Sequence, residues 1–155
     1  MNILFHFLLN YLFIDAIWGN ALGYVALIFV FSVLIDVTHL PYIIRVKGKI
    51  FKNRFGSASR TKFHEIYGLT LFSVIACLLY FLVNYVIVEI AMMCLVLHFA
   101  IDFLAGKSMP FYPFSKKEVF LGILPYEYKN KILFEIASTL LLVVLLWLRL
   151  ESLVL

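Results

Sequence analysis

The stretch YVIVEIAMMCLVLHFAIDFLA, residues 85–105, decides the fold class. It is long enough to cross the hydrocarbon core of a bilayer, which needs about 20 predominantly apolar residues. Near its end it carries His98 and Asp102, which lie four residues apart and therefore on one face of a helix. The stretch predicts a membrane helix with a polar, ionisable face.

Four further apolar segments lie on either side of this stretch. The chain has 155 residues, of which 65% are hydrophobic and 14% charged, whereas soluble domains are roughly half apolar and a quarter charged. We therefore expect an all-α integral membrane protein: a compact bundle of about five transmembrane helices, or four if the first is re-entrant, in one domain over residues 1–155. The other four segments are approximately 3–18, 21–44, 63–83 and 132–150.

The basic residues predict which side of the membrane each loop occupies. Lys and Arg are concentrated in segments 45–62 and 107–131, which two predicted spans separate. Both loops therefore lie on one side, which the positive-inside rule makes cytoplasmic. The N-terminus then lies inside, and without a basic n-region or cleavage site it is expected to stay as the first helix. Because the charge is confined to loops that flank spans, it favours a lipid bilayer as partner and not nucleic acid.

Ionisable residues recur at a similar depth on three of the predicted helices. Asp36 and His39 lie near the cytoplasmic end of the second segment, and His64 and Glu65 begin the third. The pair His98 and Asp102 belongs to the fourth. The fifth segment begins at the same level, where it carries Glu135. The topology thus predicts that these side chains converge at the cytoplasmic end of the bundle.

A divalent metal ion would explain the convergence. An ionised carboxylate in a span costs at least about 2.5–3.5 kcal/mol, and a bound cation would neutralise it. Histidine with Asp or Glu suits Zn²⁺ best, with Mn²⁺ or Fe²⁺ as alternatives. We predict Glu65 as a general base and Glu135 as a supporting residue. The predicted ligands are Asp36, His39, His64, His98 and Asp102.

Other interpretations of the same residues remain open. The cluster could form an ion or proton pathway, or a hydrogen-bonded network that only fixes helix packing. Glu65 in a first helical turn is also expected from the helix dipole. His6 and Asp15 have no evident partners in the sequence, Asp15 is expected near the outer surface, and Cys94 is expected to be a packing residue.

The loop GKSMPFYPFSKKEVFLGILPYEYKN, residues 106–130, follows the fourth helix directly. Its prolines, aromatic residues and lysines are typical of a segment that lies along a membrane interface. Beside a metal site it could act as a lid or bind a lipid headgroup through Lys107, Lys116 and Lys117. The alternative interpretation is a basic anchor that sets the topology.

Three motifs together resemble one known family. LIDVTHLP, SRTKFHE and HFAID followed by GKSMPFYPFS are similar to the motifs of the YdjM-like family of small, LexA-regulated prokaryotic inner-membrane hydrolases. The resemblance covers roughly residues 34–115. It places Asp36 and His39 on an LPDIDH-type motif and His64, with Arg60 as a supporting residue, on an HRGxTHS-type motif. His98 and Asp102 fall on the family's HxxxD helix, while Thr38 and Ser59 stand where the family has a second Asp and another His.

The resemblance implies a metal-dependent hydrolase in the cytoplasmic (inner) membrane. Its substrate would be a lipid or another small molecule with an interfacial phosphoester. A bound cation would activate water, and Glu65 would act as base. The alternative is a protein without catalytic activity that uses the same cluster for ion or proton transport or for metal binding.

Overall fold

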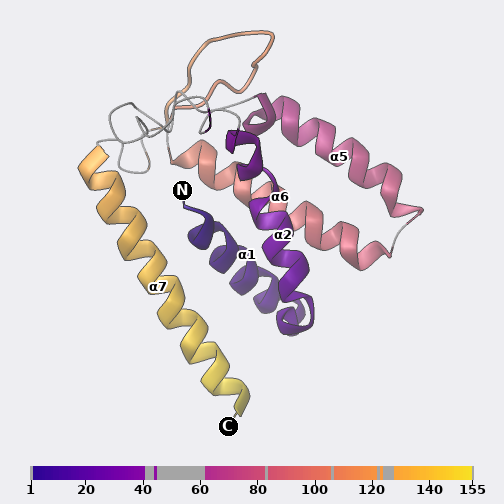
Figure 1. Cartoon of the computed structure of the whole chain (residues 1–155), viewed down its shortest axis with the longest axis vertical. Helices are drawn as coiled ribbons and strands as arrows, with labels where there is room; N and C mark the ends of the chain where they lie inside the picture. Colours follow the sequence, from indigo (N-terminus) through magenta and orange to yellow (C-terminus); the bar gives the residue numbers. More distant parts are fainter. Residues whose placement is uncertain are drawn as a thin grey trace.

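The computed structural model describes residues 2–40, 44, 62–82, 84–105, 107–121, 123 and 128–154 (Figure 1). The described part of the chain is mostly helical, and residues 107–121 form an irregular loop with one isolated antiparallel bridge between Ser108 and Val119. In chain order the elements are α1 (Ile3–Trp18), η1 (Ala21–Tyr24), α2 (Val25–Leu34), η2 (Asp36–His39), η4 (Lys62–His64), α5 (Ile66–Tyr80), α6 (Tyr85–Leu104) and α7 (Tyr128–Val154).

Short capping motifs separate the helices. The side chain of Asn2 accepts a hydrogen bond from the Phe5 amide at 2.7 Å and begins α1. Gly19 ends α1 in the left-handed conformation, with φ of 69°, and donates its amide to the Asp15 carbonyl. Asn84 caps α6 by accepting from the Val86 amide. Gly19 thus ends α1, and Asn84 begins α6.

Helix α6 lies at the centre of the bundle. It packs against α2 and α5 and also contacts α1, while α7 packs against α1 on the far side (Figure 1). Ile14, Ile28, Ile90 and Cys94 are fully buried where α1, α2 and α6 meet. Leu142 of α7 joins a smaller cluster at the start of α1. These two apolar clusters hold α1, α2, α6 and α7 together. They thereby fix the relative positions of the helix ends that carry the ionisable residues.

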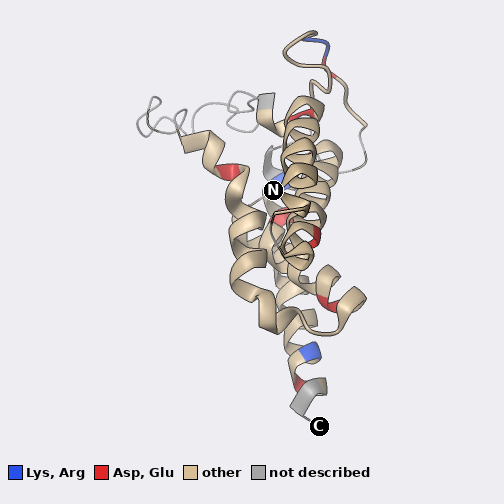
Figure 2. Ribbon diagram, turned by 90° about the vertical axis from the view of Figure 1, so that its right-hand side faces the viewer, with Lys and Arg blue, Asp and Glu red and all other residues tan. Residues whose placement is uncertain are grey.

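The outer surface of the bundle is apolar. Three helical segments are long and apolar enough to cross a membrane, namely Ala21–His39, Tyr85–Leu104 and Asn130–Ser152. Only 6% of the last segment is buried within the chain, so its many Leu and Val side chains face outward. Figure 2 shows how rarely a charged residue interrupts the helices. An exposed apolar surface of this extent indicates a membrane protein.

Helices α1 and α5 are shorter than a typical transmembrane helix. They contain 16 and 15 residues, so at a rise of 1.5 Å per residue they extend only about 24 and 22 Å. The hydrocarbon core is about 30 Å thick. All five predicted helices are present at the expected positions, but the length needed to span a membrane unaided is found in three.

Gly68 sets the position of the segment before α5. A Cβ atom at this residue would lie 2.1 Å from the Phe63 carbonyl oxygen. Only glycine therefore allows the short η4 turn to fold back onto α5. This close approach places His64 and Glu65, which follow Phe63, in the interior of the bundle, where both are buried.

Candidate metal centre

All four histidines of the chain gather at one end of the bundle with two aspartates. This is the end of the bundle at which α1 begins and α6 ends. His6 comes from the first turns of α1, Asp36 and His39 from η2, His64 from η4, and His98 and Asp102 from the last turns of α6. We call these six residues the His/Asp cluster: His6, Asp36, His39, His64, His98 and Asp102.

Asp36 occupies the middle of the cluster. Its Oδ1 atom lies 3.6 Å from Nε2 of His98 and 3.9 Å from Nε2 of both His39 and His64. The 3-10 geometry of η2 contributes to this arrangement because residues i and i+3 lie in line along such a turn. Asp36 and His39 therefore face the same way. The Asp36 carboxylate lies near His98 of α6 and His64 of η4, and the His39 ring lies against the His64 ring.

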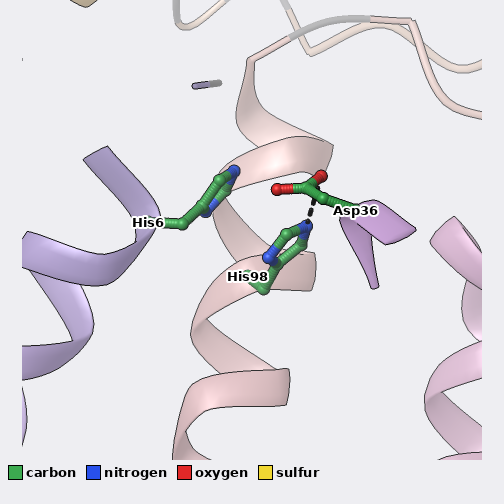
Figure 3. Close-up of side chains that lie close together, drawn as sticks. All are labelled: His6, Asp36 and His98. Atoms are coloured by element: carbon green, nitrogen blue, oxygen red, sulfur yellow. Dashed lines mark ion pairs between the residues drawn. The ribbon is translucent and has the colours of Figure 1, made fainter. Parts of the chain in front are cut away.

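Asp102 forms the second half of the cluster with two imidazoles. Its Oδ2 lies 3.5 Å from Nε2 of His98, and its Oδ1 lies 3.5 Å from Nε2 of His6. The rings of His6 and His98 stack with centroids 3.9 Å apart and an angle of 11°. Figure 3 shows these two rings side by side, with Asp36 facing His98. On the other side of Asp36, the rings of His39 and His64 lie 4.0 Å apart.

The distances within the cluster suit ligands of a metal ion better than ion pairs. A charge-assisted N–H···O bond measures about 2.7–2.9 Å, and the separations here are 3.5–3.9 Å. Two ligands at about 2.1 Å from one ion, at a tetrahedral angle, lie about 3.4 Å apart. Three groups of these residues bring their ligand atoms within 4.8 Å of one another. The buried His and Asp side chains can therefore hold a metal ion.

Three buried atoms of the cluster support this conclusion. Nε2 of His6, Nε2 of His98 and Oδ2 of Asp36 make no hydrogen bond within the part of the chain that the structure describes. Both imidazoles are only 1% exposed. A buried polar atom without a hydrogen bond costs about 1–3 kcal/mol, and a cation bound to these atoms would remove that cost.

Hydrogen bonds behind the cluster orient two of the imidazoles. Nδ1 of His98 lies 3.1 Å from the Ser32 carbonyl oxygen, which can only accept, so Nδ1 carries the proton. The Thr38 hydroxyl donates to the Ile35 carbonyl at 2.7 Å and lies 3.3 Å from Nδ1 of His64, from which it accepts. In both rings the Nε2 lone pair is thereby directed into the cluster, as a metal ligand requires.

A polar contact between α1 and α2 lies beneath the cluster. The Asn10 amide donates to the Ser32 hydroxyl at 2.8 Å, and that hydroxyl donates to the Ile28 carbonyl at 2.6 Å. Cys94 packs against the same hydroxyl with its sulfur 3.9 Å away and is fully buried. None of the three ligand groups found in the described residues includes Cys94, in agreement with its predicted packing role.

Glu65 contacts the loop that follows α6. Its Oε2 accepts from the Ser108 hydroxyl at 2.8 Å, and its Oε1 accepts from the Met109 amide at 3.0 Å. The residue is buried, and the three ligand groups of the described chain do not include it. Both carboxylate oxygens thus anchor the loop, which was not foreseen when Glu65 was predicted to be a general base.

The structure describes one of the two supporting residues predicted from the sequence, Glu135, and does not place it in the cluster. Glu135 lies half-buried on α7 and is absent from the three ligand groups found among the described residues. Arg60 lies outside the described residues. Among the loop lysines, Lys107 pairs with Glu118 at 3.1 Å.

Two residues that we expected to lack partners have them. His6 belongs to the cluster, and the predicted topology contained the signal for it, because a cytoplasmic N-terminus puts residue 6 at the depth of the other histidines. Asp15 lies at the opposite end of α1, where its Oδ2 accepts from Arg149 Nε at 2.6 Å and its Oδ1 from the Ala21 amide at 3.1 Å. The pairing with Arg149 joins residues 134 positions apart, which no local pattern indicates.

Comparison with family models, with curated proteins and with solved structures finds no match to this chain. The candidate site therefore rests on its own geometry.

Proposed function

We propose that this protein is a membrane-embedded, metal-dependent hydrolase. The observation that carries the proposal is the convergence of four imidazoles, three of them buried, and two carboxylates from four separate parts of the chain. The similarity of the motifs around Asp36, His64 and His98 to those of the YdjM-like inner-membrane hydrolases supports the same conclusion. We place the cluster, and the N-terminus with it, on the cytoplasmic side of a prokaryotic inner membrane.

The choice of ligands supports a metal role over a purely structural one. Ionisable groups in membrane spans are costly and are as a rule functional. A network that only fixed packing would be expected to form short hydrogen bonds, whereas His6, His98 and Asp36 keep buried atoms without one in the described chain. Imidazole with carboxylate suits Zn²⁺, and Mn²⁺ or Fe²⁺ fit the same set.

The loop after α6 supports a substrate at the membrane interface. Its side chains Phe111 and Phe114 are 63% and 88% exposed, and aromatic residues of this kind are enriched at the level of the headgroups. Lys116 and Lys117 follow and are also exposed, so they can attract an anionic headgroup. Ser108 and Met109 attach this loop to Glu65, next to His64. A phosphoester carried by a lipid fits this position.

The chemistry divides between the ion and the chain. A bound divalent cation supplies Lewis acidity and lowers the pKa of water. Asp36, His64 and His98 would bind the cation through a carboxylate oxygen and two imidazole nitrogens. The surrounding apolar helices exclude bulk water. The loop bonded to Glu65 carries the exposed Lys116 and Lys117, which would attract an anionic substrate.

The proposal is tested by metal-dependent hydrolysis in detergent or in vesicles. Purified protein would be assayed on bis(p-nitrophenyl) phosphate and on vesicles containing phosphatidylglycerol and phosphatidic acid. We expect activity that EDTA abolishes, that Zn²⁺ or Mn²⁺ restores, and that His98→Ala lowers at least about 100-fold. Asp15→Asn changes a buried carboxylate at the other end of α1 and serves as the matched control. Equal rates in wild type and His98→Ala would refute the proposal.

A second candidate is proton or metal transport. The observation that favours it is the series of imidazole rings, in which His39–His64, His64–His98 and His98–His6 are 4.0, 6.1 and 3.9 Å apart. Such a series can relay protons. Flux in proteoliposomes without any hydrolysis would select this candidate over the first.

A further inference from the structure

We propose that the His/Asp cluster binds two divalent cations, with Asp36 as the ligand shared between them. His39 and His64 complete one site, and His6, His98 and Asp102 complete the other. This inference rests on the proposed metal-dependent function but makes a separate claim about the number of ions and about His6.

The number of potential ligands exceeds what one ion needs. A catalytic zinc site uses about three protein ligands and keeps one position for water or substrate. The cluster offers six side chains in three groups: two contain Asp36, one with His39 and His64 and one with His6 and His98, and the third joins His64 to His98 and Asp102. One site of three ligands and one of four, with Asp36 common to both, use all six residues and leave no imidazole unassigned.

The position of Asp36 between two pairs of rings carries the inference furthest. The pair His39–His64 lies on one side and the pair His6–His98 on the other. Oδ1 of Asp36 is within 3.6–3.9 Å of nitrogens from both pairs. Its Oδ2 is buried and makes no hydrogen bond in the described chain. A carboxylate with one oxygen close to both pairs of rings and the other without a hydrogen bond in the described chain is suited to bridge two ions.

The position of Asp102 between His6 and His98 supports the assignment of His6 to the second site. The two oxygens of its carboxylate face the two imidazoles of one stacked pair, each at 3.5 Å. His6 is 1% exposed, and its Nε2 makes no hydrogen bond with the described residues. Helix α1 therefore contributes a nitrogen ligand and does more than cover the site.

A two-ion centre narrows the class of substrate. Paired ions about 3.5–4 Å apart are typical of enzymes that cleave phosphoesters, because they stabilise both the attacking and the leaving oxygen. Two divalent cations also outweigh the charge of the two aspartates in the cluster. The resulting positive centre would attract an anionic phosphomonoester or phosphodiester in preference to a neutral carboxylic ester.

Metal counting on single variants tests the inference. The full-length protein would be purified in detergent, loaded with Mn²⁺ alone, and analysed by plasma mass spectrometry and by electron paramagnetic resonance. We expect two Mn²⁺ per wild-type chain and the spectrum of an exchange-coupled pair. His6→Ala and His39→Ala should each retain one ion with an uncoupled spectrum, because each removes a ligand of a different site. Asp15→Asn should retain both ions.

The outcomes separate this inference from the proposed function. One ion per wild-type chain with an uncoupled spectrum would overturn the two-ion centre and leave a single-metal hydrolase intact. No ion in wild type would overturn both proposals. Two ions retained in His6→Ala would overturn the assignment of His6. The wild-type count and spectrum decide the number of ions even if a variant fails to fold.

Discussion

At the scale of single residues, the hydrogen bonds behind the histidines direct their Nε2 atoms into the cluster, as a metal ligand would require. The Ser32 carbonyl and the Thr38 hydroxyl each hold an Nδ1 proton, which leaves Nε2 of His98 and of His64 as the ligand atom. Thr38 contacts the His64 imidazole through its hydroxyl, so a side chain outside the His/Asp cluster fixes the orientation of one of its rings.

Thr38→Val tests this orienting role. The substitution keeps the shape of the side chain but removes the partner of His64 Nδ1. We expect metal affinity to fall about 10- to 100-fold, as for other changes of groups that hold a metal-binding histidine. The measurement is a competition titration with a fluorescent zinc chelator. Ser138→Ala is the control, since that hydroxyl bonds to the Phe134 carbonyl of its own helix, and unchanged affinity in Thr38→Val would contradict the role.

Glu65→Gln distinguishes a loop anchor from a general base. The carboxylate accepts from both Ser108 and Met109, and an amide offers one acceptor oxygen in place of two. If Glu65 is an anchor, the substitution should lower stability by about 1–3 kcal/mol and speed hydrogen exchange at Met109. Ser108→Ala should act in the same direction. A loss of activity with unchanged exchange and unchanged stability would instead identify Glu65 as the base.

At the scale of elements, short turns position the ligands more than the long helices do. The 3-10 turn η2 aligns Asp36 with His39, and the turn η4 directs His64 inward. The turns adjoin α2 and α5, and at helix ends backbone groups are not all bonded within the helix, so the chain can change direction. The position of η4 depends on the close approach of its backbone to Gly68.

Gly68→Ala should displace η4 from α5. The added Cβ would lie 2.1 Å from the Phe63 carbonyl oxygen, a backbone atom that cannot move alone. We expect a loss of about 1–3 kcal/mol of stability, typical of overpacking, together with weaker metal binding because His64 moves. Gly23→Ala is the matched control, since the nearest atom to its Cβ would be 3.6 Å away. Thermal melting in detergent and metal titration measure both effects, and equal behaviour of the two variants would contradict the role of Gly68.

At the scale of the whole molecule, α7 is attached to the bundle along α1. Apolar contacts with Phe5 and Leu8 hold its middle, and the pair Asp15–Arg149 holds its end. Asp15 is buried and Arg149 is 38% exposed. The pair lies far from the His/Asp cluster along α1, so the attachment of α7 and the proposed metal binding can be tested separately.

Arg149→Leu should destabilise the fold without changing its metal content. The substitution leaves Asp15 buried with only the Ala21 amide as a partner among the hydrogen bonds described above, and we expect a loss of about 1–3 kcal/mol. The double variant Asp15→Leu with Arg149→Leu should recover part of that loss, because no buried carboxylate is then left unpaired. Melting temperature and metal count in detergent check both expectations. A fall in metal content would contradict the separation of the two ends.

The sequence by itself determined the helical fold, the positions of the five helices and five members of the cluster. Hydrophobic runs and turn residues are local signals, and alternating helix direction brings Asp36, His64 and His98 to one end without knowledge of the packing. The place of His6, the loop contacts of Glu65 and the partner of Asp15 were decided only by the tertiary structure. Each depends on how helices rotate and tilt against one another, and that rotation follows from side-chain packing between segments far apart in the chain.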